Sequence, residues 1–188
     1  MNKPCVGLIE FASIAKGIET VDALLKKAVV RILIAQTISS GKYLVMFDGE
    51  VEDVKSSFAE GLRIGAQSVL DSFVIPNMSL SIIETLKSKP SVYDLSAIGI
   101  LETTTCATCI EAVDSALKIA SVELVKIHLG KGIAGNAYFI INGEVGDVET
   151  AILAATKIAK RKNTLIEKVI IPQVTPEIVQ AFRPTFQL

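Results

Sequence analysis

Two cysteines separated by two residues form the pattern in this chain that most suggests chemistry, Cys106 and Cys109. A lone CxxC pair can act as a redox dithiol, supply half of a zinc site, or pack as two small hydrophobic side chains. No second CxxC accompanies it, and the single histidine, His128, lies on a predicted strand. The three interpretations stay open from the residues, and packing is the simplest because cysteine is often buried.

Two glutamates, Glu10 and Glu102, stand at equivalent places in two similar stretches of the chain. General acid–base catalysis would require them to meet in one pocket, but the similarity assigns them to different domains. We therefore interpret them as structural hydrogen-bonding residues. The sequence holds no nucleophile–base constellation, phosphate loop or metal-ligand cluster, which predicts a protein that is not an enzyme, with no catalytic residue and no metal.

The chain repeats itself over almost its whole length. The separation between matching residues grows through two small insertions without losing register, which chance does not produce. The sequence thus predicts a tandem duplication, with domains at residues 1–90 and 91–188 and a linker near 88–96. The matching segments are VGLIE at 6–10 with IGILE at 98–102, GEV at 49–51 with 143–145, and IP at 75–76 with 171–172.

Hydrophobic periodicity predicts the elements of each copy. The order strand, helix, strand, strand, helix, strand is that of a ferredoxin-like α+β domain, an antiparallel sheet with both helices on one face. Short appendices follow, at 80–87 and 176–182. For the first copy we expect strands at 5–11, 30–38, 42–47 and 72–75, a helix that Ser13 caps and that runs to about Val29, and a second helix over 51–68.

The composition limits the possible partners. The 188 residues include 19 basic and 20 acidic side chains, a balance that argues against a broad nucleic-acid interface. No apolar run approaches the roughly 18 residues of a membrane span, and the N-terminus does not fit a signal peptide, so we expect a soluble, cytoplasmic protein. Half of the residues are hydrophobic and the mean hydropathy is +0.49, which favours burial of surface between subunits as well.

Several of these residues together resemble the bacterial microcompartment (BMC) shell domain. The resemblance rests on Gly7 and Glu10 in the first strand, the helix segment 22–28 and Gly41-Lys42, repeated as Gly99, Glu102 and 114–118. Two unpermuted copies resemble the tandem-domain shell proteins of propanediol- and ethanolamine-type compartments. The resemblance implies a pseudohexameric homotrimer that joins other shell proteins in a facet of the cytoplasmic compartment.

The same resemblance implies a central pore for small polar metabolites, lined by the loops between the second and third strands of each copy. Hydroxyls and backbone amides suit such molecules, and an inward Lys131 would favour anions. From the residues alone these segments are ordinary turns. The implied pore residues are Ile38, Ser39, Ser40 and Gly41 in the first copy, and Gly130, Lys131, Gly132, Ile133, Ala134 and Gly135 in the second.

Two departures from the family qualify these expectations. Some tandem shell proteins carry a cysteine in the first loop that holds an iron–sulfur cluster; Ser39 stands there instead, so we expect no cluster and no cofactor. Many shell domains also have an arginine after the last strand, where this chain has 77–78 and 173–174 without one. Weaker edge contacts, and hence facets mixed with other shell proteins, follow from the second departure.

Lys26 and Lys118 occupy equivalent helix ends. The resemblance places them along the tile edge, where one pseudohexameric trimer meets the next in the facet. The residues alone fit solvated lysines that interact favourably with the helix dipole. Two other functions also stay open: a ligand-sensing regulator built from two ferredoxin-like domains, and a redox protein that uses the CxxC pair. A tight small-molecule site would favour the regulator, and loss of function in a double Cys→Ser variant would favour the redox protein.

Overall fold

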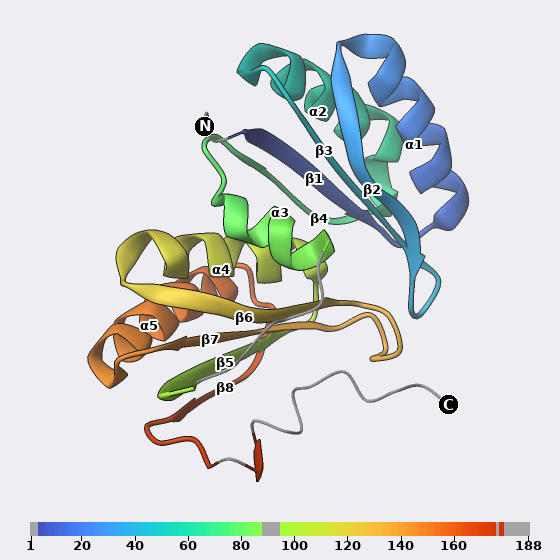
Figure 1. Cartoon of the computed structure of the whole chain (residues 1–188). Helices are drawn as coiled ribbons and strands as arrows, with labels where there is room; N and C mark the ends of the chain where they lie inside the picture. The colour runs from blue at the N-terminus through green and yellow to red at the C-terminus, as the bar shows by residue number, and fades with distance from the viewer. Residues whose placement is uncertain (1–3, 88–94, 176, 179–188) are drawn as a thin grey trace.

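The computed structural model describes residues 4–87, 95–175 and 177–178 (Figure 1). Most of the predicted linker, and most of the second appendix at 176–182, lie outside the described residues. The domain boundaries at 1–90 and 91–188 therefore stay predictions, although two similar folding units are evident on either side of them.

Each unit is a four-stranded antiparallel sheet, with strand order β2-β3-β1-β4 in the first and β6-β7-β5-β8 in the second. Two helices cover one face of each sheet (Figure 1). The predicted ferredoxin-like α+β fold, in unpermuted order and in two copies, is confirmed. The elements are β1 (Cys5–Phe11), α1 (Ile14–Lys27), β2 (Val30–Ile38), β3 (Lys42–Gly49), α2 (Val51–Gly65), the 3₁₀ turn η1 (Ala66–Ser68), β4 (Val69–Ile75), α3 (Leu80–Lys87), β5 (Ala97–Thr103), α4 (Cys106–Ile119), β6 (Val122–Leu129), β7 (Ala137–Gly143), α5 (Val145–Arg161) and β8 (Leu165–Ile171).

The predicted bounds differ from the structure at four ends. Strand β3 runs on to Gly49, two residues past its predicted end, because its pairing with β1 and β2 continues there. Helix α1 stops at Lys27 because Ala28 is already extended. Helix α2 stops at Gly65, and a 3₁₀ turn completes the segment because Ala66 takes a φ of 43°. Strand β4 begins at Val69, earlier than predicted, because its pairing with β1 continues past the polar Asp71. In each case local backbone geometry or pairing extended or shortened a correctly predicted element.

Polar caps begin the first helix of each copy. The Ser13 side chain accepts a hydrogen bond from the backbone of Lys16 at 3.3 Å, and Thr105 accepts one from Thr108 at 3.4 Å. Each cap satisfies one of the backbone donors left free at a helix start. The predicted Ser13 cap is thereby confirmed.

The two domains share a hydrophobic core. The face of the first sheet that α1 and α2 leave uncovered is turned toward α3 and α4 (Figure 1). Apolar side chains of that face belong to one continuous cluster with helix α4, and most are fully buried. This contact fixes the second domain against the first. The residues of the face are Val6, Leu8, Leu44, Met46, Phe73 and Ile75.

Candidate functional site

The two loops expected to line a pore lie against each other within one chain. The backbone N–H of Ser39 donates to the carbonyl of Gly130 at 3.2 Å. The N–H of Gly132 donates to Ser39 Oγ at 2.7 Å, and Ser40 Oγ donates to the carbonyl of Ala134 at 3.1 Å. The structure thus brings the two predicted segments together at one end of the domain junction.

The tips of these loops are exposed, and their bases are buried. Ser40, Gly41, Lys131, Gly132 and Ala134 are exposed. Ser39 and Ile133 are half-buried, whereas Ile38, Gly130 and Gly135 are buried. The surface that the loops offer is therefore one of hydroxyls, backbone amides and the Lys131 side chain.

Glycine is required at the base of the second loop. Gly130 has a φ of 67°, and a Cβ there would lie 2.8 Å from Ile38 Cβ and 3.2 Å from Cys106 Sγ. Any side chain would push the first loop away and strain the backbone. The close contact between the loops depends on this residue.

His128 stabilises the same loop. Its Nε2 lies 2.6 Å from the Lys131 carbonyl, and its ring stacks on Tyr138 with centroids 5.5 Å apart. The ammonium of Lys126 lies 5.6 Å from the Tyr138 centroid on the same strand pair. The histidine lies on a strand, as predicted, and its ring supports the turn that follows.

Glu10 joins the two domains beneath the loops. Its side chain is fully buried, and its carboxylate accepts the backbone N–H groups of Cys106 at 2.7 Å and Ala107 at 3.2 Å. Lys42 Nζ lies 3.1 Å from the other oxygen, and it also contacts the carbonyls of Thr104 and Gly135. Burial raises the pKa of Glu10, although Lys42 and the two N–H groups oppose the shift. The interpretation of Glu10 as a structural hydrogen-bonding residue is confirmed.

A second polar cluster surrounds Asp71 at the same junction. Its carboxylate accepts hydrogen bonds from the hydroxyls of Thr105 at 2.5 Å and Thr108 at 2.6 Å. Lys162 Nζ lies 2.9 Å from Asp71 and 2.6 Å from Glu111. Burial alone would raise the pKa of Asp71, but these hydrogen bonds and the lysine lower it overall.

Lys42, Asp71 and Lys162 are functional residues that were not predicted from the sequence. For the two lysines a signal was present, because the copies differ in charge there: Asn136 replaces Lys42 in the second copy, and Ala66 replaces Lys162 in the first. Asp71 gave no such signal, since its counterpart Glu167 is also acidic. A charge present in one copy only is unnecessary for the fold of a domain. It therefore points to the surface where the domains meet.

The CxxC pair lies in the first turn of α4, under the domain junction. Both thiols are fully buried and free. Cys5 is also buried and free. Burial and the nearby Glu10 carboxylate raise the pKa of Cys106, and burial raises that of Cys109 well above its usual value. Thiols held in this protonated form are poor nucleophiles and poor metal ligands, which favours the packing role.

Neither loop carries a thiol, and the hydroxyl of Ser39 is engaged with Gly132. In the described part of the chain, no group of three or more His, Cys, Asp and Glu side chains is placed to hold a metal ion. Within those same residues, no helix is long and apolar enough to cross a membrane. The donor set at the loops does not fit an iron–sulfur cluster.

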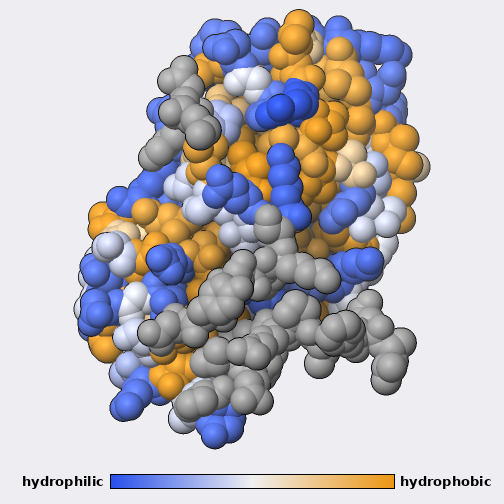
Figure 2. Space-filling model, viewed as in Figure 1, coloured by the Kyte–Doolittle hydropathy of each residue, from blue (hydrophilic) through white to orange (hydrophobic). Residues whose placement is uncertain are grey.

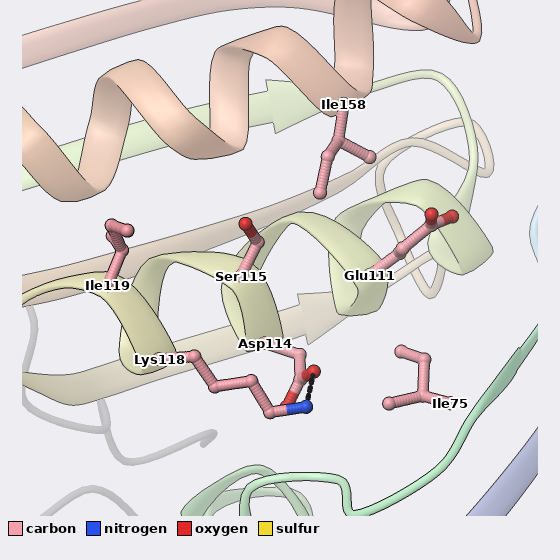
Figure 3. Close-up of a pocket in the computed structure, with 7 residues that line it drawn as sticks. All are labelled: Ile75, Glu111, Asp114, Ser115, Lys118, Ile119 and Ile158. Carbon is pink, nitrogen blue, oxygen red and sulfur yellow. Dashed lines mark hydrogen bonds and ion pairs between the residues drawn. The ribbon is translucent and has the colours of Figure 1, made fainter.

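The two predicted edge lysines each form an ion pair along their own helix. Lys26 Nζ lies 2.6 Å from Asp22, and Lys118 Nζ lies 2.5 Å from Asp114. Lys118 belongs to an open pocket of about 300 Å³ where α4, α5 and β4 meet, and Figure 3 shows its contact with Asp114. The pocket is lined by Ile75, Glu111, Asp114, Ser115, Lys118, Ile119 and Ile158.

Helices α1 and α4 are equivalent, yet their surroundings differ. On α4 the first domain buries Cys106, Ala107 and Ile110 completely. The matching positions on α1 are exposed, with Ile14 at 37% and Ile18 at 56%. Hydrophobic residues gather over this side of the first domain, around α1 and β2 (Figure 2). The surface of α4 that the first domain covers therefore has an uncovered counterpart on α1.

Comparison with known proteins agrees with this fold. The BMC domain model matches twice, at residues 5–78 and 97–174. A bacterial microcompartment shell protein, PduT of Citrobacter freundii, is 39% identical over 168 residues, which is 89% of this chain and 91% of that protein. A carboxysome assembly protein, CcmO of Synechocystis, is 27% identical over 92% of this chain, which covers 62% of the CcmO length.

Solved structures show the same likeness. A microcompartment protein from Desulfitobacterium hafniense superimposes with a TM-score of 0.82 at 37% identity, over 94% of this chain and 98% of that one. A fused permuted hexameric shell protein shares the fold at 22% identity and a TM-score of 0.65, over 84% of each chain. With two BMC domains in tandem and this similarity along most of its length, the chain belongs to the BMC-domain family of bacterial microcompartment shell proteins.

Proposed function

We propose that the chain is a structural facet component of a bacterial microcompartment shell in the cytoplasm, and that it has no catalytic activity. Three copies form a pseudohexameric ring of six BMC domains, which joins other shell proteins in the facet. Small polar metabolites pass through a pore at the centre of the ring. The family supports the shell role. The exposed face of α1 and the second sheet support the trimer, and the paired loops support the pore.

One observation carries the trimer: the chain uses only half of a repeated interface. The face of the first sheet turned away from α1 and α2 covers α4. The equivalent face of the second sheet is only partly covered: Ile98 and Ile140 are buried there, whereas Val169 is 44% exposed. Helix α1 offers Ile14 and Ile18 in the place where α4 offers Cys106 and Ile110. Placing α1 of one copy on the second sheet of another satisfies both surfaces, and repetition with rotational symmetry closes a ring.

The paired loops support the pore. Ring closure brings three copies of each loop toward one axis, because the loops lie at the same end of both domains. Their exposed hydroxyls and amides can replace the water shell of a polar molecule without trapping it. Three Lys131 side chains at the axis would favour anionic metabolites over cations.

Tile edges are the remaining part of the proposal. Lys26 is the more available of the two edge lysines, with 74% of its side chain exposed against 38% for Lys118. Its pair with Asp22 is exposed, and exposed pairs of this kind contribute little to stability, whereas the Asp114 that pairs with Lys118 is buried. Edge contacts made by these lysines with neighbouring shell proteins would therefore be weak and exchangeable, which suits a mixed facet.

The native mass of the purified chain, measured by light scattering after size exclusion, tests the proposal. Closed threefold symmetry predicts about 60 kDa, three times the 20.1 kDa of one chain. Larger material that resolves into trimers at higher salt would also agree, since tile edges would carry charged contacts. A stable monomer or dimer would contradict the ring and the pore. Such a result with a saturable small-molecule site would favour the ligand-sensing regulator instead.

A further inference from the structure

The junction between the two domains of one chain provides a template for the contact between chains, and this inference rests on the proposed trimer. We infer that an ion pair between Lys16 of one subunit and Glu167 of the next holds the trimer together. A second contact, between Glu102 and the N-terminus of the neighbouring α1, lies beside it. These residues bind a second copy of this chain and no other partner.

Strand register fixes which residues correspond. Glu10 pairs with Asp71 across β1 and β4, and Glu102 pairs with Glu167 across β5 and β8. Asp71 and Glu167 each accept a hydrogen bond from the backbone N–H of the next residue. Ser72 donates to Asp71 at 2.8 Å, and Lys168 donates to Glu167 at 2.8 Å. The carboxylates of Asp71 and Glu167 thus occupy matching places, and each makes the same kind of hydrogen bond within its own strand. One is at the domain junction, and the other is exposed.

The template within the chain is a lysine between two carboxylates. Lys162 lies 2.9 Å from Asp71 on the first sheet and 2.6 Å from Glu111 on α4. At the corresponding place between chains, Glu167 replaces Asp71 and Glu19 replaces Glu111. Ala66 replaces Lys162, so this position supplies no cation. Two carboxylates brought together without a cation would repel each other.

Lys16 supplies the missing cation from another position. It corresponds to Thr108, whose hydroxyl lies 2.6 Å from Asp71. In the single chain Lys16 Nζ already lies 2.7 Å from Glu19, with 46% of its side chain exposed. When α1 docks as α4 does, Lys16 lies between Glu19 and Glu167. The arrangement of one lysine and two acids is retained although the lysine comes from a different element.

Glu102 repeats the role of Glu10 in this arrangement. Glu10 accepts the N–H groups of Cys106 and Ala107 at the start of α4, and the matching donors on α1 are the N–H groups of Ile14 and Ala15. Early N–H groups of a helix have no partner in the helix itself, and they favour a carboxylate. Asn136 replaces Lys42 here, so Glu102 gains no lysine and depends on the neighbouring helix.

A charge exchange tests the ion pair. The concentration at which trimers are half dissociated is measured by sedimentation velocity for the wild type, Lys16→Glu, Glu167→Lys and the double variant. Each single change places like charges together and should raise that concentration at least about tenfold. The double variant restores the opposite charges and should return it to within about threefold of wild type. Lys27→Glu, an equal change on an exposed residue of the same helix, should leave it unchanged.

The outcomes separate this inference from the proposed function. If the wild type is a trimer and the single variants dissociate as it does, the Lys16–Glu167 pair is wrong while the trimer stands. Single variants that dissociate without rescue in the double variant also overturn the pair. If the wild type forms no trimer, the proposed function and the inference fail together. Circular dichroism confirms folding, and Lys16→Gln with Glu167→Gln repeats the test should a charge reversal unfold the chain.

Discussion

The carboxylate of Glu10, at the end of the first strand of one domain, lies 2.7 Å from the backbone nitrogen of Cys106, at the start of a helix in the other. A fully buried acid thus binds a helix N-terminus across a domain junction, and Lys42 balances its charge. The arrangement couples the two halves of a duplicated chain through one side chain. It also explains why a strand glutamate has no catalytic partner.

Glu10→Ala should uncouple the domains. The change leaves the half-buried Lys42 without a counter-charge and two helix N–H groups without an acceptor, which predicts a loss of about 3 kcal/mol in unfolding free energy. Urea denaturation monitored by circular dichroism measures the loss. Glu123→Ala, at an exposed strand position, should cost less than about 0.5 kcal/mol. Equal effects of the two variants would contradict a special role for Glu10.

Asp71 predicts acid sensitivity at the junction. Because its hydrogen bonds lower its pKa in the folded state below the ordinary 3.8, its contribution is fully present above that value. The contribution is lost as the pH falls through the lowered pKa. Asp71→Asn should reduce the unfolding free energy by about 2 to 4 kcal/mol at neutral pH. Thermal melts should show a smaller difference between variant and wild type below pH 3.8. A difference that grows on acidification would have the wrong sign.

Two glycines of the second loop form a matched pair. Gly130 and Gly132 both have positive φ, 67° and 78°, but only at Gly130 would a Cβ meet other atoms within 4 Å. Gly132→Ala should cost about 1 kcal/mol from backbone strain alone. Gly130→Ala adds overpacking against Ile38 and should cost about 2 to 4 kcal/mol. Chemical denaturation compares the two variants, and similar costs would show that the loops are not packed together at Gly130.

The thiols should be unreactive in the folded protein. Cys5, Cys106 and Cys109 are buried and free, and burial raises the pKa of each. A disulfide reagent such as Ellman's at pH 8 should therefore label none within minutes and all three after denaturation. Rapid labelling of two thiols in the native state would revive the redox interpretation.

Ser40→Cys tests whether the first loop approaches the trimer axis. Because Ser40 is exposed and the native thiols are buried, the variant offers one accessible thiol per chain. Mild oxidation should join chains in pairs across the axis, giving a dimer band on a non-reducing gel. Thr150→Cys, exposed on α5, is the matched control and should remain unlinked in the same trimer. Equal linking of both variants would argue against a shared axis at the loops.

The strand and helix order could be read from the sequence because it depends on local properties. Alternation in β2, the Ser13 cap and the Gly41 turn each act within a few neighbouring residues. Because the chain is duplicated, the same order of strands and helices could be predicted independently from each half. The duplication also identified the family, since residues such as Glu10 and Glu102 recur in register.

The surroundings of equivalent residues could not be read in this way. Ile18 and Ile110 lie at the same position of the same helix type, yet the first is 56% exposed and the second is fully buried. Sequence periodicity assigns a residue to a helix face but does not say what covers that face. The Glu10–Cys106 and Asp71–Lys162 contacts join residues 96 and 91 positions apart, so only the docking of one domain on the other creates them. The sequence alone determined the fold of each half, and the tertiary structure decided which of two like surfaces is filled, because burial depends on what lies opposite a face in space.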